Sequence, residues 1–235
     1  MRLTRESTGM AARKAPLSIS GPTDFAEAFK VPRETIHRLT CFAELLAHWQ
    51  KRTNLVAPST LSTLWSRHFA DSAQLTTLAP KARLWLDLGT GAGFPGLVIA
   101  ILKAGTPDFR MHLAESNRKK CAFLAEVARA AKAPVGIHAT RIEDLAQSAN
   151  RLAPDVVSAR ALAPLPRLFD LAAPFFAAGT RGLFLKGREA EAEVEAAKAE
   201  WDFTARLVPS LTAANSRIVE VTNLRPRAGS EARSR

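Results

Sequence analysis

The feature that most constrains the fold is an alternation of short apolar runs with helix-length segments, which begins at Leu84. Strands that alternate with helices of this length indicate βαβ units, and these build a parallel sheet with helices on both faces. The predicted strands occupy residues 84–88, 110–115, 135–140, 155–160, 182–187, 203–207 and 216–224. The predicted helices occupy residues 95–104, 117–132, 142–150, 164–177 and 188–200. We therefore predict an α/β fold of the Rossmann-like type.

A helical segment is predicted before this alternation. Apolar side chains recur at three- and four-residue steps at Ile36, Leu39, Phe42, Leu46 and Trp49. They form one stripe of an amphipathic helix, and Pro32 suits its start because the first helical N–H groups have no partner within the helix. A second helix is predicted over residues 59–78. We expect a short helical segment over residues 23–80 and an α/β domain over residues 81–224.

The charge favours a polyanionic partner. The chain carries a formal net charge of +11 at pH 7. Residues 1–22 and residues 217–235 contribute +3 each, and we expect residues 1–22 and 225–235 to be disordered basic tails. Basic tails are common, so charge alone is only moderate support for nucleic-acid binding.

Several classes of protein are disfavoured by the composition. No apolar run is long enough to span a bilayer, and the N-terminal residues contain no apolar stretch typical of a secretory signal. Cys41 and Cys121 stand alone within apolar helical patterns, as expected for free thiols in a reducing cytosol. The five histidines show no metal-ligand spacing. We expect a cytoplasmic protein without a metal site.

A glycine-rich segment follows the first predicted strand. Its letters "GAGFPG", residues 91–96, match the pattern G-x-G-x-x-G of dinucleotide-binding folds, which is weak when it stands alone. Gly89, Gly91 and Gly93 permit positive φ angles and a close approach of the backbone to a ligand. Asp87 argues against a pyrophosphate, because a carboxylate would repel it. The same carboxylate suits the amino group of S-adenosylmethionine (SAM).

Other candidate residues stand where predicted strands end, and parallel sheets bind ligands at that edge. Glu115 follows the second strand and can accept hydrogen bonds from ribose hydroxyls, which SAM and NAD share. After the third strand, Ile142 and Glu143 either meet an adenine edge or belong to an acidic helix start. Arg160 ends a buried strand and needs an anionic or aromatic partner. A structural ion pair is the alternative for Arg160.

Five segments together resemble, in order and spacing, the RsmG (GidB) family of bacterial small-subunit rRNA guanine-N7 methyltransferases. They are "RHFADS", "LDLGTGAGFPGLVIAI", "LAESNRKKCAFLAEVAR", "SARALAPLPRLFDLAAPF" and "GLFLKGRE". The resemblance covers residues 30–222. It implies a class I SAM-dependent methyltransferase fold with a mostly parallel seven-stranded sheet. It also implies cofactor contacts at Gly89, Phe94, Glu115, Ile142, Glu143 and Arg160.

The resemblance further implies transfer of a methyl group from SAM to N7 of a guanine in 16S rRNA near the decoding region, leaving S-adenosyl-L-homocysteine. The partner is 16S rRNA or a precursor of the small ribosomal subunit, and a monomer is favoured. We expect no general acid or base. The candidates that position the guanine are Arg160, Phe94, Arg67 and His68. The candidates for RNA binding are Arg118, Lys119, Lys120, Lys186, Arg188 and Arg217.

Two other functions remain open from the sequence. One is an NAD-dependent oxidoreductase that uses the glycine-rich segment for a dinucleotide. The other is a non-catalytic SAM- and RNA-binding factor in ribosome assembly.

Overall fold

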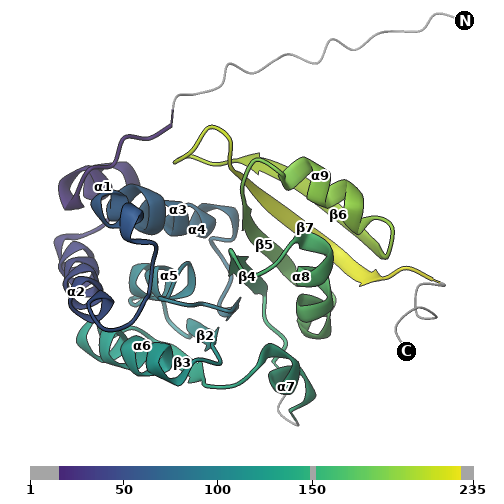
Figure 1. Cartoon of the computed structure of the whole chain (residues 1–235), viewed down its shortest axis with the longest axis horizontal. Helices are drawn as coiled ribbons and strands as arrows, with labels where there is room; N and C mark the ends of the chain where they lie inside the picture. The colour runs from purple at the N-terminus through teal and green to yellow at the C-terminus, as the bar shows by residue number, and fades with distance from the viewer. Residues whose placement is uncertain (1–15, 149–151, 229–235) are drawn as a thin grey trace, which may run out of the picture.

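The computed structural model describes residues 16–148 and 152–228, and a seven-stranded sheet runs through its centre (Figure 1). The strands are β1 (Leu84–Leu88), β2 (Arg110–Ala114), β3 (Val135–His138), β4 (Val156–Arg160), β5 (Arg181–Lys186), β6 (Trp201–Pro209) and β7 (Arg217–Pro226). All seven predicted strands are present, and their ends lie within two residues of the expected ones.

The order of the strands determines where a ligand can bind. The order is β3-β2-β1-β4-β5-β7-β6; β1 to β5 pair in parallel, and β7 pairs antiparallel with both β5 and β6. The chain leaves β1 toward one edge of the sheet and then returns to β4 on the other side of β1. Ligands of such sheets bind at the carboxyl ends of the strands beside this reversal.

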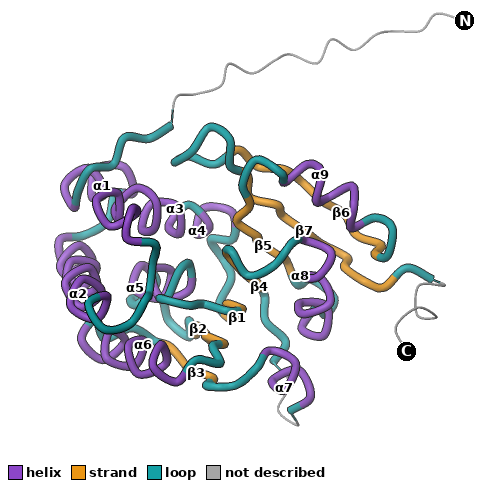
Figure 2. The backbone as a smooth tube through the Cα atoms, viewed as in Figure 1, coloured by secondary structure: helices purple, strands orange, loops and turns teal. Residues whose placement is uncertain are grey.

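Helices cover both faces of the sheet, as Figure 2 shows, and each face has its own apolar core. The first face is covered by α5 (Gly96–Leu102), α6 (Arg118–Ala130) and the N-terminal helices. The second is covered by α7 (Ile142–Gln147), α8 (Leu165–Ala172) and α9 (Ala190–Ala197), with a short 3₁₀ turn at Ala173–Phe175. Successive residues of β1 reach opposite cores, with Trp85 in the first and Leu86 in the second.

The N-terminal segment contains α1 (Pro22–Phe29) and the expected amphipathic helix α2 (Arg33–Gln50). The prediction of one continuous helix over residues 59–78 is wrong. A 3₁₀ helix (Pro58–Thr63), a π-helix (Trp65–Ala70), α3 (Asp71–Ala73) and α4 (Leu75–Leu78) follow one another there. The hydroxyls of Thr60, Thr63, Thr76 and Thr77 donate to backbone carbonyls three residues earlier, and this competes with a regular helix.

The described chain begins before the expected boundary at residue 22. Ile19 is buried, the Leu17 amide donates to the Leu211 carbonyl at 2.7 Å, and α1 starts at Pro22. Strand β7 likewise runs to Pro226, beyond the expected end of the domain at residue 224. Residues 1–15 and 229–235 of the two expected tails lie outside the described residues.

No helix within the described ranges has the length and apolar character that a membrane crossing requires.

Aromatic packing joins the N-terminal segment to the sheet domain. Phe42 of α2 is fully buried and stacks on Phe94 of the glycine-rich loop, with ring centroids 5.1 Å apart and planes at 15°. Phe42 also packs against Phe69 and against Phe123 of α6. The N-terminal helices therefore share the core of the first face and do not form a separate unit.

Replacing Phe42 with Ala should lower the free energy of unfolding by about 3–5 kcal/mol, because a large buried ring would leave a cavity at this junction. Urea unfolding followed by tryptophan fluorescence measures the change. Glu44→Ala, at an exposed position of the same helix, should stay within about 0.5 kcal/mol of the original protein. A loss below about 1 kcal/mol for Phe42→Ala would contradict a shared core.

Candidate active site

The glycine-rich loop between β1 and α5 has a backbone that only glycine adopts without strain. Gly89, Gly91 and Gly93 all have positive φ angles. At Gly89, φ is +61°, and an added Cβ would lie 2.6 Å from Cδ1 of Leu162, which follows β4. The close approach of these two segments therefore requires glycine at position 89.

Asp87, in the strand before this loop, accepts hydrogen bonds from the start of α5 and from β4. Its side chain is fully buried; one carboxylate oxygen accepts from the Gly96 amide at 2.9 Å, and the other accepts from the Ser158 hydroxyl at 2.8 Å. Burial raises the pKa of Asp87 to about 6. The carboxyl group ties β1 to β4 and to the start of α5, whereas the sequence led us to expect it facing the amino group of a ligand.

A cavity of about 340 Å³ opens at the ends of β1, β2 and β3. Five of the expected cofactor residues line it together: Gly89, Gly91, Glu115, Ile142 and Glu143. Glu115 accepts from the Gly91 amide at 3.0 Å and from the Asn117 amide at 2.8 Å. Each carboxylate oxygen keeps a further acceptor position, so the side chain can also bind hydroxyl donors.

A second cavity, of about 600 Å³, adjoins the first one. Both cavities are lined by Ala161 and Leu162, the residues that follow β4. Three of the expected guanine-positioning residues line the second cavity: Arg67, His68 and Arg160. Phe94, the fourth, is buried beneath them and faces the ring of Phe42.

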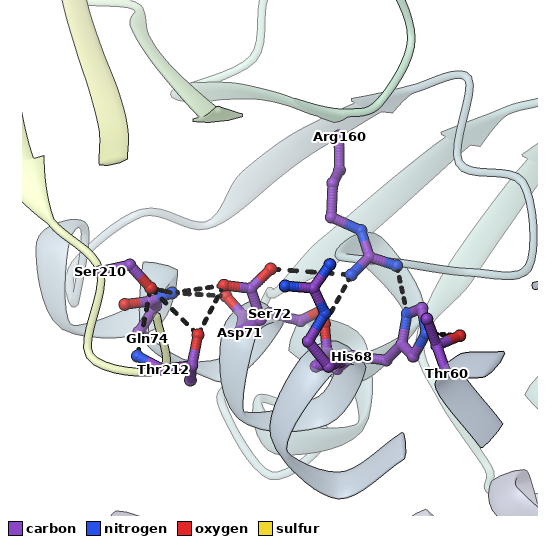
Figure 3. Close-up of polar contacts among 9 residues, drawn as sticks. Thr60, His68, Asp71, Ser72, Gln74, Arg160, Ser210 and Thr212 are labelled. Atoms are coloured by element: carbon purple, nitrogen blue, oxygen red, sulfur yellow. Dashed lines mark hydrogen bonds and ion pairs between the residues drawn. The ribbon is translucent and has the colours of Figure 1, made fainter. Parts of the chain in front are cut away.

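Arg160 is held by three groups from the π-helix and α3 (Figure 3). Its guanidinium donates to the Arg67 carbonyl at 2.9 Å and to Nδ1 of His68 at 2.7 Å, and it lies 3.6 Å from a carboxylate oxygen of Asp71. Its Cζ also lies over the Phe94 ring, 5.0 Å from the centroid. Arg160 therefore has an aromatic partner and also makes the ion pair within the chain that was the alternative to a ligand.

His68 is neutral in this arrangement, and each of its ring nitrogens makes one hydrogen bond. A guanidinium only donates, so Nδ1 of His68 is the acceptor and Nε2 carries the proton. Nε2 lies 2.8 Å from the Thr60 hydroxyl, which itself donates to the Ala57 carbonyl at 2.7 Å. Burial, with the nearby charges of Arg160 and Arg67, lowers the pKa of His68 to about 3.

Asp71 connects Arg160 to the loop between β6 and β7. One of its oxygens accepts from the Gln74 amide and from the Thr212 hydroxyl, each at 2.9 Å. Figure 3 shows Gln74 between Asp71 and Ser210. The side-chain oxygen of Gln74 accepts from the Leu211 amide at 2.8 Å. Asp71 belongs to the segment "RHFADS" but had no predicted role, and neither Gln74 nor Thr212 was predicted from the sequence.

Six basic residues were expected to bind RNA, and the structure divides them. Arg118, Lys119 and Arg188 are exposed, and Lys120 lines the first cavity. Lys186 is instead paired with Glu193 at 2.7 Å, and Arg217 with Glu191 at 3.3 Å. Carboxylates of α9 thus partner Lys186 and Arg217, whereas Arg118, Lys119 and Arg188 are exposed, and RNA binding by all six residues stays a prediction.

Two histidines that looked unrelated in the sequence are neighbours in the sheet. His112 of β2 and His138 of β3 have ring nitrogens 2.8 Å apart. Among the described residues, no group of three or more His, Cys, Asp or Glu side chains is arranged to hold a metal ion.

Methyltransferases are among the solved structures that share this fold. An O-methyltransferase from Bacillus cereus in complex with SAH is similar with a TM-score of 0.55 and 14% identity, over 85% of this chain and 96% of the other. The O-methyltransferase TomG from Streptomyces achromogenes, in complex with SAM, is similar with a TM-score of 0.54 and 15% identity, over 86% and 95% of the two chains. The chain thus has the fold of the class I SAM-dependent methyltransferases.

Sequence comparison identifies the family. The GidB family model, described as rRNA small subunit methyltransferase G, matches residues 35–219. Ribosomal RNA small subunit methyltransferase G of Methylorubrum populi is 51% identical over 194 residues, which are 83% of this chain and 91% of the relative. The protein of the same name from Paramagnetospirillum magneticum is 52% identical over 193 residues, 82% and 90% of the two chains. The chain belongs to the GidB family, and the two other functions left open by the sequence are not favoured.

Replacing His68 with Gln should reduce the loss of stability in acid. The unfolded chain takes up a proton at His68 as the pH falls through 6.5, while the folded protein resists this until about pH 3. Stability contributed by neutral His68 is therefore lost as the pH falls through this window, by at most about 1.4 kcal/mol per pH unit. Urea unfolding at a series of pH values, compared between the two proteins, measures the difference. Equal slopes would contradict a neutral His68.

Proposed function

We propose that the protein transfers the methyl group of SAM to N7 of a guanine in 16S ribosomal RNA, near the decoding region of the small subunit. The observation that carries this proposal is the pair of adjoining cavities at the ends of β1 and β4, which share Ala161 and Leu162. One cavity has the groups that hold a nucleoside cofactor. The other has the groups that hold an unstacked base beside it.

The residues of the first cavity fit SAM. The Glu115 carboxylate has acceptor positions left for ribose hydroxyls, and Ile142 offers an apolar contact for an adenine. Because Gly89 has no side chain, a ligand in the first cavity can approach the loop backbone at this residue. When bound, SAM supplies an electrophilic methyl group on its sulfonium sulfur. The chain's own task here is to hold that methyl group toward the second cavity.

The second cavity needs no proton acceptor for this reaction, because N7 of guanine carries a free lone pair at neutral pH. Both ring nitrogens of His68 are already engaged, which suits a positioning role. Arg160 lines the cavity with a flat guanidinium, and such groups stack on unstacked bases or donate to their acceptor atoms. Arg160 is therefore assigned to positioning of the guanine.

Alignment of the two reactants is the main source of rate enhancement in this proposal. Reacting atoms held about 3–3.5 Å apart and in line can lower the barrier by about 7–11 kcal/mol. The network of His68, Arg160, Asp71 and Thr212 gives the second cavity walls with fixed hydrogen-bond geometry. A rigid wall limits the orientations that a bound guanine can adopt.

The substrate RNA is expected to approach over exposed basic residues near the cavities. Arg118 and Lys119 begin α6, directly after the strand end that bears Glu115, and Arg188 follows β5. The net charge of +11 supports a polyanionic substrate. These exposed residues replace Lys186 and Arg217 as the preferred candidates for phosphate contacts.

The test of the function is to map N7-methylguanine in 16S rRNA from a strain that lacks this chain. Borohydride and aniline cleavage followed by primer extension reads each position. The proposal expects one cleavage stop to disappear and to return with a plasmid copy of the gene, but not with a Gly89→Val copy, whose side chain would strike Leu162. An unchanged methylation pattern in the deletion strain would overturn the proposal.

Replacing Glu115 with Ala should weaken SAM binding roughly tenfold to hundredfold, because hydrogen bonds to a charged group contribute about 1.5–3 kcal/mol. Isothermal titration calorimetry measures the affinity, and circular dichroism checks the fold. Glu27→Ala, at an exposed position of α1, is the matched control and should bind SAM as the original protein does. Equal affinities in all three proteins would show that Glu115 does not hold the cofactor.

Replacing Arg118 and Lys119 together with Ala should weaken RNA binding and lower the slope of log K against log salt by about 1–2, since each lost phosphate contact removes about 0.7–0.9. Filter binding at several salt concentrations gives the slope. Lys81→Ala is the control, because Lys81 is exposed just before β1, at the edge of the sheet opposite the cavities. An unaltered slope in the double variant would mean that this helix start only faces solvent.

A further inference from the structure

Lys186 of β5 and Glu193 of α9 form an ion pair in the wall of the second cavity. One carboxylate oxygen of Glu193 is not used by this pair. Oε2 of Glu193 accepts from Nζ of Lys186 at 2.7 Å and from the Leu165 amide at 2.6 Å. Nζ of Lys186 also donates to the Ala163 carbonyl at 2.6 Å. Lys186 and Glu193 both line the cavity, and the Glu193 side chain is 23% exposed.

The second oxygen of Glu193 retains its acceptor positions. Both donors bind Oε2, and within residues 16–148 and 152–228 Oε1 makes no hydrogen bond or ion pair. Asp71, the other carboxylate of the cavity, differs in this respect. One of its oxygens accepts from Gln74 and Thr212, and the other faces Arg160. Glu193 is thus the carboxylate with an oxygen left for a ligand.

The two purine bases differ in the groups that they offer to a carboxylate acceptor. N7 lies on one edge of guanine, and the N1–H and 2-amino donors lie on the opposite edge. Glu193 lines the same cavity as Ala161 and Leu162, and its Oε2 accepts from the Leu165 amide, three residues beyond Leu162. A guanine whose N7 is directed toward the first cavity therefore lies in the cavity into which Glu193 opens. A carboxylate oxygen accepts from the 2-amino group of guanine. Adenine has no 2-amino group and presents an unprotonated N1 on this edge.

We propose that Glu193 determines specificity for guanine by accepting a hydrogen bond from the 2-amino group of the target base through Oε1. This inference rests on the proposed function, because it places the target guanine in the second cavity. Lys186 balances the charge of Glu193 and fixes its side chain. The carboxylate therefore contributes an acceptor without adding net negative charge to a cavity that receives RNA.

The test replaces the target guanosine with inosine, which lacks only the 2-amino group, in a 16S rRNA fragment assembled by ligation. The ratio of kcat/KM for guanosine over inosine is compared between the original protein and Glu193→Gln. The Gln carbonyl can keep the bonds from Lys186 and Leu165, while its amide nitrogen replaces the accepting oxygen. We expect the ratio to be roughly tenfold to hundredfold in the original protein and to fall to about threefold or less in the variant.

This ratio does not depend on the fraction of folded enzyme, so a loss of stability in the variant leaves it unchanged. The residual ratio in Glu193→Gln also reports any intrinsic difference in N7 reactivity between the two bases. Glu189→Gln, at the exposed residue before α9, is the matched control and should keep the original ratio. Asp71→Asn should slow both substrates to the same extent.

The outcomes separate this inference from the proposed function. If the original protein methylates guanosine and inosine at equal rates, or if Glu193→Gln keeps the full ratio, the role of Glu193 is overturned while N7 methylation stands. If the original protein binds SAM but methylates neither substrate, as the fragment or after assembly into the small-subunit precursor, the proposed function fails, and the inference fails with it.

Discussion

One buried carboxyl group holds together the part of the sheet on which both cavities depend. Asp87 binds the Gly96 amide and the Ser158 hydroxyl, and so connects β1, the start of α5 and β4. The strand order reverses between β1 and β4, and the glycine-rich loop joins β1 to α5 at this point. A buried polar group is costly unless it is satisfied, so this interaction strongly limits the positions that the loop can occupy.

A second hydrogen-bonded network fixes side chains that line the second cavity. Arg160 leaves the end of β4 and is fixed by groups of the N-terminal segment, while Asp71 extends the network to the loop after β6. The N-terminal helices are therefore part of the catalytic domain. The π-helix supplies both the Arg67 carbonyl and His68 to this network, in agreement with the frequent occurrence of π-helical turns at functional sites.

Much of the fold and of the cofactor cavity could be predicted because both follow from local rules. Apolar runs of strand length mark β1 to β7, and the carboxyl ends of parallel strands meet at one edge, which brings Gly89, Glu115 and Ile142 together. The partners of charged side chains follow no such rule. Nothing in the sequence near Lys186 shows that its ammonium group pairs with Glu193 of α9. Likewise, nothing near Asp87 shows that its carboxylate accepts from the Gly96 amide and does not face a ligand. The broken helix after Pro58 depends on packing that propensity does not describe.

The hydrogen bond between Thr212 and Asp71 joins residues that are 141 positions apart in the chain. The residues that line the first cavity all lie between Gly89 and Leu171, whereas the second cavity also requires Thr212, Ala213 and Ser216. During synthesis the chain emerges from its N-terminus, so every residue that lines the first cavity is made before the last two strands. The last residues of the second cavity are made only when translation is nearly finished, so a chain truncated before Thr212 would have every residue of the first cavity and lack part of the second.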